Sequence, residues 1–275
     1  SSMSQTILIT GASSGIGKAA ATLFADRGWN VVATMRNTDD GASLAGRDNV
    51  LITTLDLLDS ESITKAVAEG VDRFGAIDVL LNNAGYGAYG PLETTPMTVL
   101  RRQFDVNVFG LVETIQAVLP SMRAQRSGVI INISSVGGRM TFPLGSLYHG
   151  SKWAVEGLSE ALHFELAMLG IRVKLVEPGG VNTDFGGRSF VFTQNPEFPD
   201  YQPLVDMATA ALQEEASDDN QEPHEVAEVI FAAATDGTDQ LRYISGDGAA
   251  QLLANRYSAE QDEQFVAGMR AQFGL

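Results

Sequence analysis

The chain contains no cysteine, which excludes disulfides, thiolate nucleophiles, iron–sulfur clusters and cysteine-based zinc sites. It has only three histidines, too few for a histidine-rich metal site, and we expect no catalytic metal. Basic residues are also scarce, with 18 lysines and arginines against 34 aspartates and glutamates and a net charge of −16. Because such a surface repels polyanions, nucleic acids and anionic membranes are unfavourable partners.

Long apolar runs are missing as well. No run approaches the roughly 20 residues that a membrane-spanning helix needs, and the N-terminus lacks the basic and apolar regions of a signal peptide. We therefore expect a cytoplasmic protein. Ser1 and Ser2 precede Met3, as in the remnant of a purification tag, so residues 1–5 are not interpreted as part of the fold.

What is present is enough apolar material for a sizeable core, with 44% hydrophobic and 19% charged residues in 275. Short β-rich runs alternate with segments of helical spacing. The sequence predicts strands at 6–9, 31–34, 50–56, 77–81, 129–134 and 173–179, helices at 18–26, 60–74, 97–122, 147–169 and 224–234, and a last short strand within 241–248 before a charged C-terminal helix. Strands separated by helices imply right-handed crossovers. We predict a single α/β domain over residues 1–275, a doubly wound parallel sheet of three layers (a Rossmann fold).

This alternation stops after Pro178. Residues 185–203 are rich in glycine, proline, phenylalanine and asparagine, and so long a loop in a compact domain is usually functional. We predict a substrate lid over residues 185–223, with an aromatic lining that only partly touches the substrate, and a helical extension over residues 249–275. The aromatic residues expected at the lid are Phe142, Phe185, Phe190 and Phe192.

A glycine-rich turn, TGASSGIG, places Gly11, Gly15 and Gly17 between the first strand and the first helix. There the backbone must turn tightly and approach a pyrophosphate at the helix N-terminus. The spacing differs from the commoner G-x-G-x-x-G fingerprint. Its position at the first turn of a parallel sheet nevertheless favours a dinucleotide, since ligands bind at the carboxyl ends of the strands.

The end of the second strand indicates which dinucleotide is bound. A chain that binds NAD usually has an acidic residue there for the ribose 2′-hydroxyl, but this stretch carries Met35 and Arg36. Arg36 can form a charge-assisted, fork-shaped pair with a 2′-phosphate, and Ser14 can donate its hydroxyl to the same group. We predict NADP(H) rather than NAD(H). The alternative is that Arg36 is a solvated surface residue.

Tyr148 and Lys152 lie one helical turn apart on one face of a predicted helix. A tyrosine with a pKa of about 10 is a poor acid–base group at neutral pH, and a nearby cation lowers that pKa. Ser135 ends the preceding buried strand and faces the same cleft. We therefore predict that Tyr148 donates and accepts a proton. The alternative is an interfacial tyrosine beside a lysine that extends to solvent.

Five motifs occur in order along the chain: TGASSGIG, NNAG at 82–85, Asn107 within FDVNVFG, ISS before YHGSK, and PGGVNT at 178–183. Over about residues 6 to 184 the chain resembles the short-chain dehydrogenase/reductase family in its single-domain form. The runs ATMRN, SVGGRM and YHGSKWAVEGLSEAL are most similar to the branch of 17β-hydroxysteroid and retinol dehydrogenases, which implies a bulky apolar substrate.

The resemblance implies a role for each matching residue. Tyr148 is the catalytic acid/base, Ser135 holds the substrate oxygen, and Asn107 holds a water of the proton relay. Lys152 contacts the ribose and modifies the tyrosine pKa. Donors fixed at the oxygen stabilise the charge that develops there. Asp56 is expected at the adenine, and Val181 and Thr183 at the carboxamide. The full predicted cofactor site is Gly11, Ser13, Ser14, Gly15, Ile16, Gly17, Arg36, Asp56, Leu57, Asn83, Ala84, Gly85, Tyr148, Lys152, Pro178, Gly179, Val181 and Thr183.

Together these features predict an NADPH-dependent carbonyl reductase, reversible as an alcohol dehydrogenase, with a small-molecule carbonyl or alcohol substrate. One alternative is a redox sensor or scaffold that binds NADP(H) without turnover. A sugar-nucleotide epimerase or dehydratase would need a larger C-terminal domain. The ending RYISGDGA differs from that of tetrameric family members, so we favour a homodimer through the two long helices over a homotetramer.

Five other residues are assigned by position. His149 follows Tyr148 along the helix and is turned about 100° away from the catalytic face. Tyr86 and Tyr89 follow the fourth strand and either wall the substrate pocket or pack as partly exposed side chains. Trp153 and Phe164 are expected in core or subunit packing.

Overall fold

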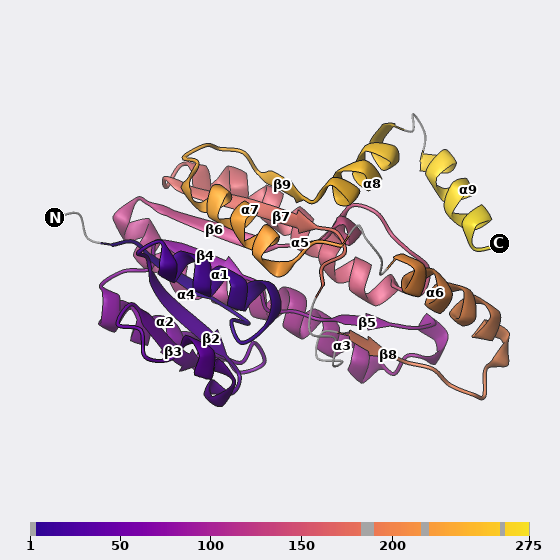
Figure 1. The fold of residues 1–275 in the computed structure, drawn as a ribbon, viewed down its shortest axis with the longest axis horizontal. Coiled ribbons are helices and arrows are strands. Elements are labelled where there is room, and N and C mark those ends of the chain that lie inside the picture. The colour runs from indigo at the N-terminus through magenta and orange to yellow at the C-terminus, as the bar shows by residue number, and fades with distance from the viewer. Residues whose placement is uncertain (1–3, 183–189, 216–219, 259–261, 275) are drawn as a thin grey trace.

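The computed structural model describes residues 4–182, 190–215, 220–258 and 262–274. Seven parallel strands form one sheet in the order β3-β2-β1-β4-β6-β7-β9 (Figure 1). Their bounds are β1 Thr6–Ile9, β2 Asn30–Met35, β3 Val50–Thr54, β4 Val79–Asn82, β6 Gly128–Ile133, β7 Ile171–Pro178 and β9 Arg242–Ser245. The chain order reverses between β1 and β4, which is the ligand-binding switch point of a doubly wound sheet. The predicted fold class is confirmed.

Helices cover both faces of this sheet and make three layers. Helices α1 (Gly15–Asp26) and α7 (Pro223–Thr235) lie against one face, and α2 (Ser60–Phe74), α4 (Leu111–Gln125) and α5 (Ser146–Ala167) against the other. Alternate strand residues supply the two cores, because successive side chains point to opposite faces. In β1, for example, Ile7 and Ile9 belong to the core under α1 and α7, and Leu8 to the core under the other three helices.

The helix predicted at 97–122 is interrupted. It consists of α3 (Met97–Phe104), a π-helical turn over Asp105–Gly110, and α4. Gly110 permits close packing there, since a Cβ at this position would lie 2.6 Å from the Leu57 Cβ. Single π-turns inside α-helices occur frequently at functional sites, and this one contains Asn107.

The predicted lid loop contains regular structure that the sequence pattern did not indicate. Strand β8 (Phe190–Phe192) pairs in parallel with β5 (Gly87–Tyr89), and a 3-10 turn at Pro199–Tyr201 leads into α6 (Gln202–Glu215). The Tyr201 hydroxyl donates to Glu93 Oε1 at 2.7 Å, which ties the segment to the 3-10 turn Leu92–Thr94. The prediction of an irregular loop over 185–203 was therefore wrong for its described part.

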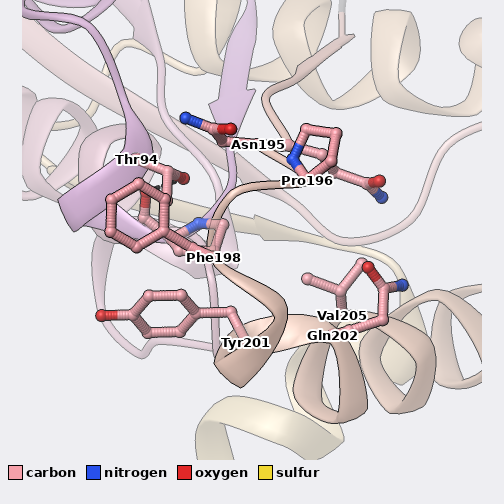
Figure 2. Close-up of a pocket in the computed structure, with 9 residues that line it drawn as sticks. Thr94, Asn195, Pro196, Phe198, Tyr201, Gln202 and Val205 are labelled. Atoms are coloured by element: carbon pink, nitrogen blue, oxygen red, sulfur yellow. Dashed lines mark hydrogen bonds between the residues drawn. The ribbon is translucent and has the colours of Figure 1, made fainter.

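Residues of the predicted lid line a pocket of about 90 Å³ together with Pro91 and Thr94, and these lid residues lie between 194 and 205 (Figure 2). Phe198, Tyr201 and Val205 contribute apolar surface, and Asn195 and Gln202 contribute amides. Within the described chain, the predicted catalytic residues lie outside this lining.

The C-terminal extension forms two helical segments where one was predicted, α8 (Asp247–Ser258) and α9 (Asp262–Gln272). Ala249 and Leu253 of α8 pack against Val136 and Met140, which follow the end of β6. The extension thus covers the loop that begins at Ser135. Among the described residues, no helix is long and apolar enough to cross a bilayer.

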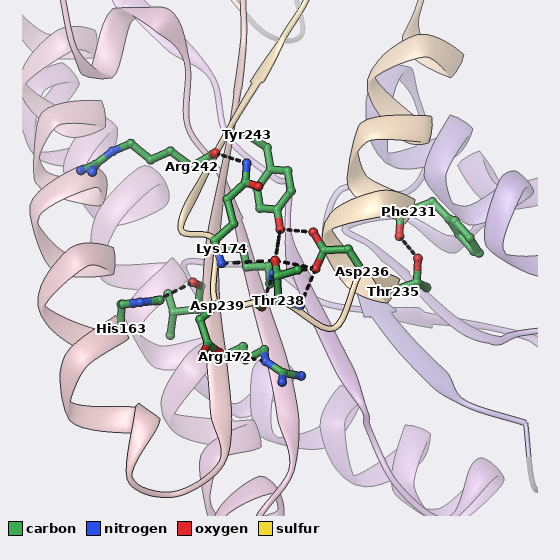
Figure 3. A network of polar contacts seen from close by, with 12 residues as sticks. His163, Arg172, Lys174, Phe231, Thr235, Asp236, Thr238, Asp239, Arg242 and Tyr243 are labelled. Atoms are coloured by element: carbon green, nitrogen blue, oxygen red, sulfur yellow. Dashed lines mark hydrogen bonds and ion pairs between the residues drawn. The ribbon is translucent and has the colours of Figure 1, made fainter.

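A buried polar network fixes β9 and the loop before it to β7 (Figure 3). The Lys174 ammonium, which is 1% exposed, donates to Asp236 Oδ1 at 3.1 Å, to the Thr238 carbonyl at 2.8 Å and to the Tyr243 hydroxyl at 2.7 Å. The Tyr243 hydroxyl also donates to the Asp236 carboxylate. Since a buried charge must be paired, these contacts hold the last strand in register.

Candidate active site

The glycine-rich turn between β1 and α1 has the geometry of a phosphate-binding turn. Gly11 and Gly15 have positive φ angles of 66° and 54°, which favour glycine. A Cβ at Gly17 would lie 2.1 Å from the Gly11 carbonyl oxygen, so no side chain fits there. The residue before α1, Ser14, is its N-cap, and its hydroxyl makes no capping bond within the described chain. Backbone N–H groups at this helix start are suited to an anion.

The end of β4 holds this turn in place. The Asn83 amide donates to the carbonyls of Thr10 and Gly11, each at 3.2 Å. The Thr10 hydroxyl accepts from the backbone N–H groups of Asn83 and Ala84, each at 3.0 Å. A Cβ on Gly11 would lie 3.0 Å from the Ala84 Cα. The structure therefore brings the first and second predicted motifs into direct contact.

The other residues predicted at the cofactor lie along the same sheet edge. Arg36 is exposed and directly follows β2, as a contact to a 2′-phosphate requires. Asp56 lies in the turn after β3, where its Oδ1 accepts from the Leu58 N–H at 2.9 Å. Ser13 and Leu57 are half-buried, and Ile16 packs against the core under α1.

At the centre of the edge, Asn107 fixes the backbone after β4. Its amide donates to the Tyr86 carbonyl at 2.9 Å and to the Ser151 hydroxyl at 3.1 Å, and its Oδ1 accepts from the Tyr86 N–H at 3.1 Å. A Cβ at Gly85 would lie 2.9 Å from Asn107 Oδ1 and 3.9 Å from Lys152 Nζ. These contacts bring together three of the predicted motifs: NNAG, the segment around Asn107, and YHGSK. The contacts lie in the interior, since Asn107 is 2% exposed.

Ser135 and Tyr148 meet at the end of β6. The Ser135 hydroxyl is close enough to the Tyr148 hydroxyl to affect its pKa, and it accepts from the Gly137 N–H at 2.9 Å. Burial raises the pKa of Tyr148, with the Ser135 hydrogen bond acting in the opposite direction. The sequence predicted a pKa lowered by Lys152. That direction was wrong for this structure, because the loss of hydration is the larger effect.

Lys152 is buried one turn along α5. Its Nζ donates to the Ile133 carbonyl at 3.0 Å. Burial lowers the pKa of Lys152 to about 8, and the negative charge of Glu156 acts in the opposite direction. The charge of this ammonium is therefore sensitive to the groups around it near neutral pH.

His149 has a structural role that its position along the helix did not reveal. Its Nε2 accepts from the Phe142 N–H at 2.9 Å, and its Nδ1 lies 2.8 Å from the Gly137 carbonyl oxygen. A carbonyl only accepts, so Nδ1 carries the proton. Because Gly137 also donates to Ser135, the imidazole locks the loop that positions the Ser135 hydroxyl.

Aromatic side chains surround this centre. The Tyr89 ring lies 5.4 Å from the Tyr148 ring, centroid to centroid, which supports the interpretation of Tyr89 as a pocket wall. Phe142 packs beside the C-terminal helix cluster. Phe185 and Thr183 lie outside the described residues. Trp153 and Phe164, expected in core or subunit packing, are 45% and 69% exposed and are not core residues of the single chain.

The motif after β7 lies at the same edge. Pro178 ends the strand, and the Gly179 N–H donates to the Ser245 carbonyl of β9 at 3.4 Å. Val181 forms a β-bridge with Gln221. Within the described residues, no group of three or more histidine, aspartate or glutamate side chains is arranged to hold a metal ion.

Comparison with known proteins adds a family match. The family model described as short chain dehydrogenase matches residues 5–191. An uncharacterized oxidoreductase of Schizosaccharomyces pombe is 43% identical over 246 residues, which cover 88% of this chain and 100% of the yeast protein. Retinol dehydrogenase 8 of Bos taurus is 36% identical over 264 residues, covering 91% of this chain and 84% of its own. Type 1 17-beta-hydroxysteroid dehydrogenase of Mus musculus is 33% identical over 294 residues, which cover 97% of this chain and 80% of the mouse protein.

Solved structures are similar over the whole chain. A short-chain dehydrogenase from Streptomyces avermitilis superposes with a TM-score of 0.84 at 33% identity, covering 100% of this chain and 97% of the other. An alcohol dehydrogenase from Thermococcus sibiricus, complexed with 5-hydroxy-NADP, has a TM-score of 0.71 at 25% identity, covering 88% and 96%.

Proposed function

Since the chain belongs to the short-chain dehydrogenase family, as its motifs predicted, we propose that it is an NADP(H)-dependent oxidoreductase that interconverts a ketone or aldehyde with the corresponding alcohol. The observation that carries this proposal is the buried Lys152, one helical turn from Tyr148, whose Nζ donates to the Ile133 carbonyl at 3.0 Å at the strand end that leads to Ser135. A glycine-rich turn shaped for a dinucleotide lies at the same edge of the sheet. Family membership establishes an oxidoreductase, and the reaction and the cofactor are our inference.

The roles of the side chains follow from where charge develops. When bound, the nicotinamide supplies or accepts a hydride at the substrate carbon. As the substrate is reduced, negative charge gathers on its oxygen, and the hydroxyls of Ser135 and Tyr148 stabilise it by donating hydrogen bonds. Tyr148 gives its proton to that oxygen. The Lys152 ammonium stabilises the phenolate left on Tyr148, and the buried amide of Asn107 holds the backbone beside it.

Arg36 supports NADP(H) over NAD(H). It is exposed at the end of β2, where the cofactor ribose binds in this fold, and its guanidinium suits a 2′-phosphate. The structural neighbour from Thermococcus sibiricus carries an NADP derivative. Ser13, Ser14 and the α1 N-terminus are proposed to hold the pyrophosphate and phosphate oxygens, and Asp56 the adenine.

We also propose a bulky apolar substrate. The Tyr89 ring packs against the Tyr148 ring, and Phe142 lies beside the loop that carries Ser135. The relatives named retinol dehydrogenase 8 and 17-beta-hydroxysteroid dehydrogenase support this choice. The described part of the lid, with β8 and α6, is proposed to cover that substrate.

A homodimer through the long helices is proposed from their exposed apolar side chains. Phe109, in the π-helical turn before α4, is 57% exposed. Trp153, Phe164 and Met168, which lie on α5 or at its end, are 45%, 69% and 89% exposed. Exposed apolar side chains gathered on one helix mark an interaction surface more often than isolated ones do.

The test is NADPH consumption by the purified protein with aromatic ketones, steroid ketones, retinal and a β-ketoacyl thioester. We expect turnover of at least one apolar carbonyl compound, and a loss of at least about 100-fold in kcat for Tyr148→Phe with NADPH affinity kept. The matched control is Tyr257→Phe, which removes a hydroxyl from an exposed tyrosine. Tight NADPH binding without turnover of any compound would instead favour a redox sensor or scaffold.

A further inference from the structure

Two buried glutamates lie behind the proposed catalytic lysine. Glu156 is one turn beyond Lys152 on α5 and is 5% exposed, and Glu177 is fully buried in β7, directly before Pro178. Gly138 packs between them and the active-site strand end. A Cβ at Gly138 would lie 2.9 Å from Glu156 Cγ, 3.2 Å from the Lys152 carbonyl oxygen and 2.5 Å from Ser134 Oγ.

Around this pair, two arginines are paired with three carboxyl groups. Arg139 Nη1 lies 3.1 Å from Glu177 Oε1. Arg242 Nε lies 3.1 Å from Glu156 Oε1, and Arg242 Nη1 lies 2.9 Å from Oε1 of Glu160, which is half-exposed. The Arg242 guanidinium is thus paired with the carboxylates of both Glu156 and Glu160. Tyr257 stacks on the Arg139 guanidinium at 4.5 Å from ring centroid to Cζ.

One oxygen on each buried glutamate lacks a donor. Within the described chain, Oε2 of Glu156 and Oε2 of Glu177 have no hydrogen-bond donor. Both carboxyl groups lie beside the same Arg242 Nε, which is 3.1 Å from Glu156 Oε1 and 3.9 Å from Glu177 Oε2. Carboxylates only accept hydrogen bonds, so one proton between them supplies the missing donor to both. Burial, with the neighbouring Glu156, raises the pKa of Glu177 accordingly.

We propose that Glu156 and Glu177 share one proton and one negative charge, and that this charge keeps Lys152 protonated and oriented in the active site. This inference rests on the function proposed above. Glu156 and Glu177 are positioning residues, since they act through Lys152. The shared proton also links α5, which carries Tyr148, to β7, which ends at Pro178. It therefore stabilises the position of the one segment relative to the other.

Two single variants and the double variant distinguish the effect of the shared negative charge from the effect of side-chain shape. Glu156→Gln and Glu177→Gln each keep a donor between the two side chains and one negative charge, so we expect kcat at pH 7 within about threefold of the unmodified protein. The double variant, Glu156→Gln with Glu177→Gln, keeps the shape of both side chains but removes their shared negative charge. Glu160→Gln is the matched control, because it removes an equal charge from the exposed partner of Arg242.

Lys152 is observable directly because the chain has only four lysines, Lys18, Lys65, Lys152 and Lys174. With ¹³C-labelled lysine, NMR titration of the Lys152 side chain is expected to show a pKa lower by about one unit in the double variant, a tenfold change in its ionisation constant. Glu160→Gln should leave it unchanged. The same shift is expected on the alkaline side of the kcat/KM profile. An unchanged Lys152 titration in a folded double variant would overturn the proposal.

Infrared spectroscopy tests the shared proton without the double variant. The unmodified protein should show a protonated-carboxyl C=O band at pH 7 that is lost in both single variants, since each leaves one ionised glutamate. No such band, or its retention in both variants, would refute the pair. Both measurements are made without turnover. If no carbonyl compound is reduced, the proposed function fails while these results still decide the pair.

Discussion

Replacing His149 with phenylalanine tests whether the imidazole holds the loop that positions Ser135. The substitution keeps a ring of similar shape but removes two hydrogen bonds, the one from the Phe142 N–H at 2.9 Å and the one to the Gly137 carbonyl at 2.8 Å. Each buried polar group left unpaired costs roughly 1–3 kcal/mol. Since Phe142 is only half-buried, we expect a loss of about 2–4 kcal/mol in the free energy of unfolding, a large part of a typical 5–15 kcal/mol.

The loss should depend on pH in a defined direction. Burial lowers the pKa of His149 below its usual 6.5, with the Gly137 hydrogen bond acting in the opposite direction. A depressed folded-state pKa gives stability that is present above pH 6.5 and is lost as the pH falls through the folded-state value. The difference in stability between the unmodified protein and the variant should therefore shrink as the pH is lowered from 7.

The assay is urea denaturation at matched protein concentration, with kcat and KM measured on the same preparations. His163→Phe is the control, because His163 lies on the same helix and makes one hydrogen-bond contact, at 3.2 Å, with the Val173 carbonyl. We expect His149→Phe to lower kcat more than it raises KM, since the role proposed for Ser135 is in the transition state. If His149→Phe costs no more stability than His163→Phe, or if its cost is the same at pH 5 and pH 7, the reasoning is wrong.

Three further predictions concern other parts of the molecule. Arg36→Asp should lower kcat/KM for NADPH by roughly ten- to a hundredfold, the value of one or two charge-assisted hydrogen bonds, without a comparable loss for NADH; an unchanged NADPH/NADH ratio would exclude Arg36 as the phosphate contact. Lys174→Met should destabilise the fold by about 2–4 kcal/mol in thermal or urea denaturation, because it removes the cation paired with Asp236 and the donor to the Thr238 carbonyl and the Tyr243 hydroxyl. Arg172→Met, which breaks an exposed pair at 3.2 Å, should cost under about 1 kcal/mol. Phe164→Glu should give monomers in sedimentation velocity, with Val266→Glu, a substitution at another exposed apolar position, as the control; a dimer that persists would place the interface elsewhere.

The order of motifs along the chain was enough to predict the architecture and several of the residues that lie at one edge of the sheet. Parallel strands all end at one edge, so residues that follow strands must meet there. Thr10, Asn83, Ser135 and Pro178 follow or end four such strands, and the structure places them at that edge. The glycines at 11, 15 and 17 could be assigned to a tight turn from the sequence, because the turn requires a positive φ angle or leaves no space for a Cβ at these positions.

Contacts between segments distant in the chain could not be predicted from the sequence. The β5–β8 pair joins residues about a hundred positions apart, and three-residue strands carry too little periodicity to be recognised. The role of His149 depends on a loop folding back to within 2.9 Å of its ring, and helical position alone says only that it points away from Tyr148. The direction of the Tyr148 pKa likewise depends on burial, which spacing does not measure.

The sequence by itself therefore determined the fold, the family and the set of side chains at the sheet edge, since these follow from local periodicity and from motifs that have one geometrical solution. Tertiary structure alone decided how those side chains are charged and held. It buried Lys152, half-buried Tyr148 and closed the loop onto His149. It also placed Glu156 of a helix and Glu177 of a strand beside the same arginine. The physical reason is that ionisation depends on hydration and on neighbouring charges, and both are fixed only when distant segments pack together.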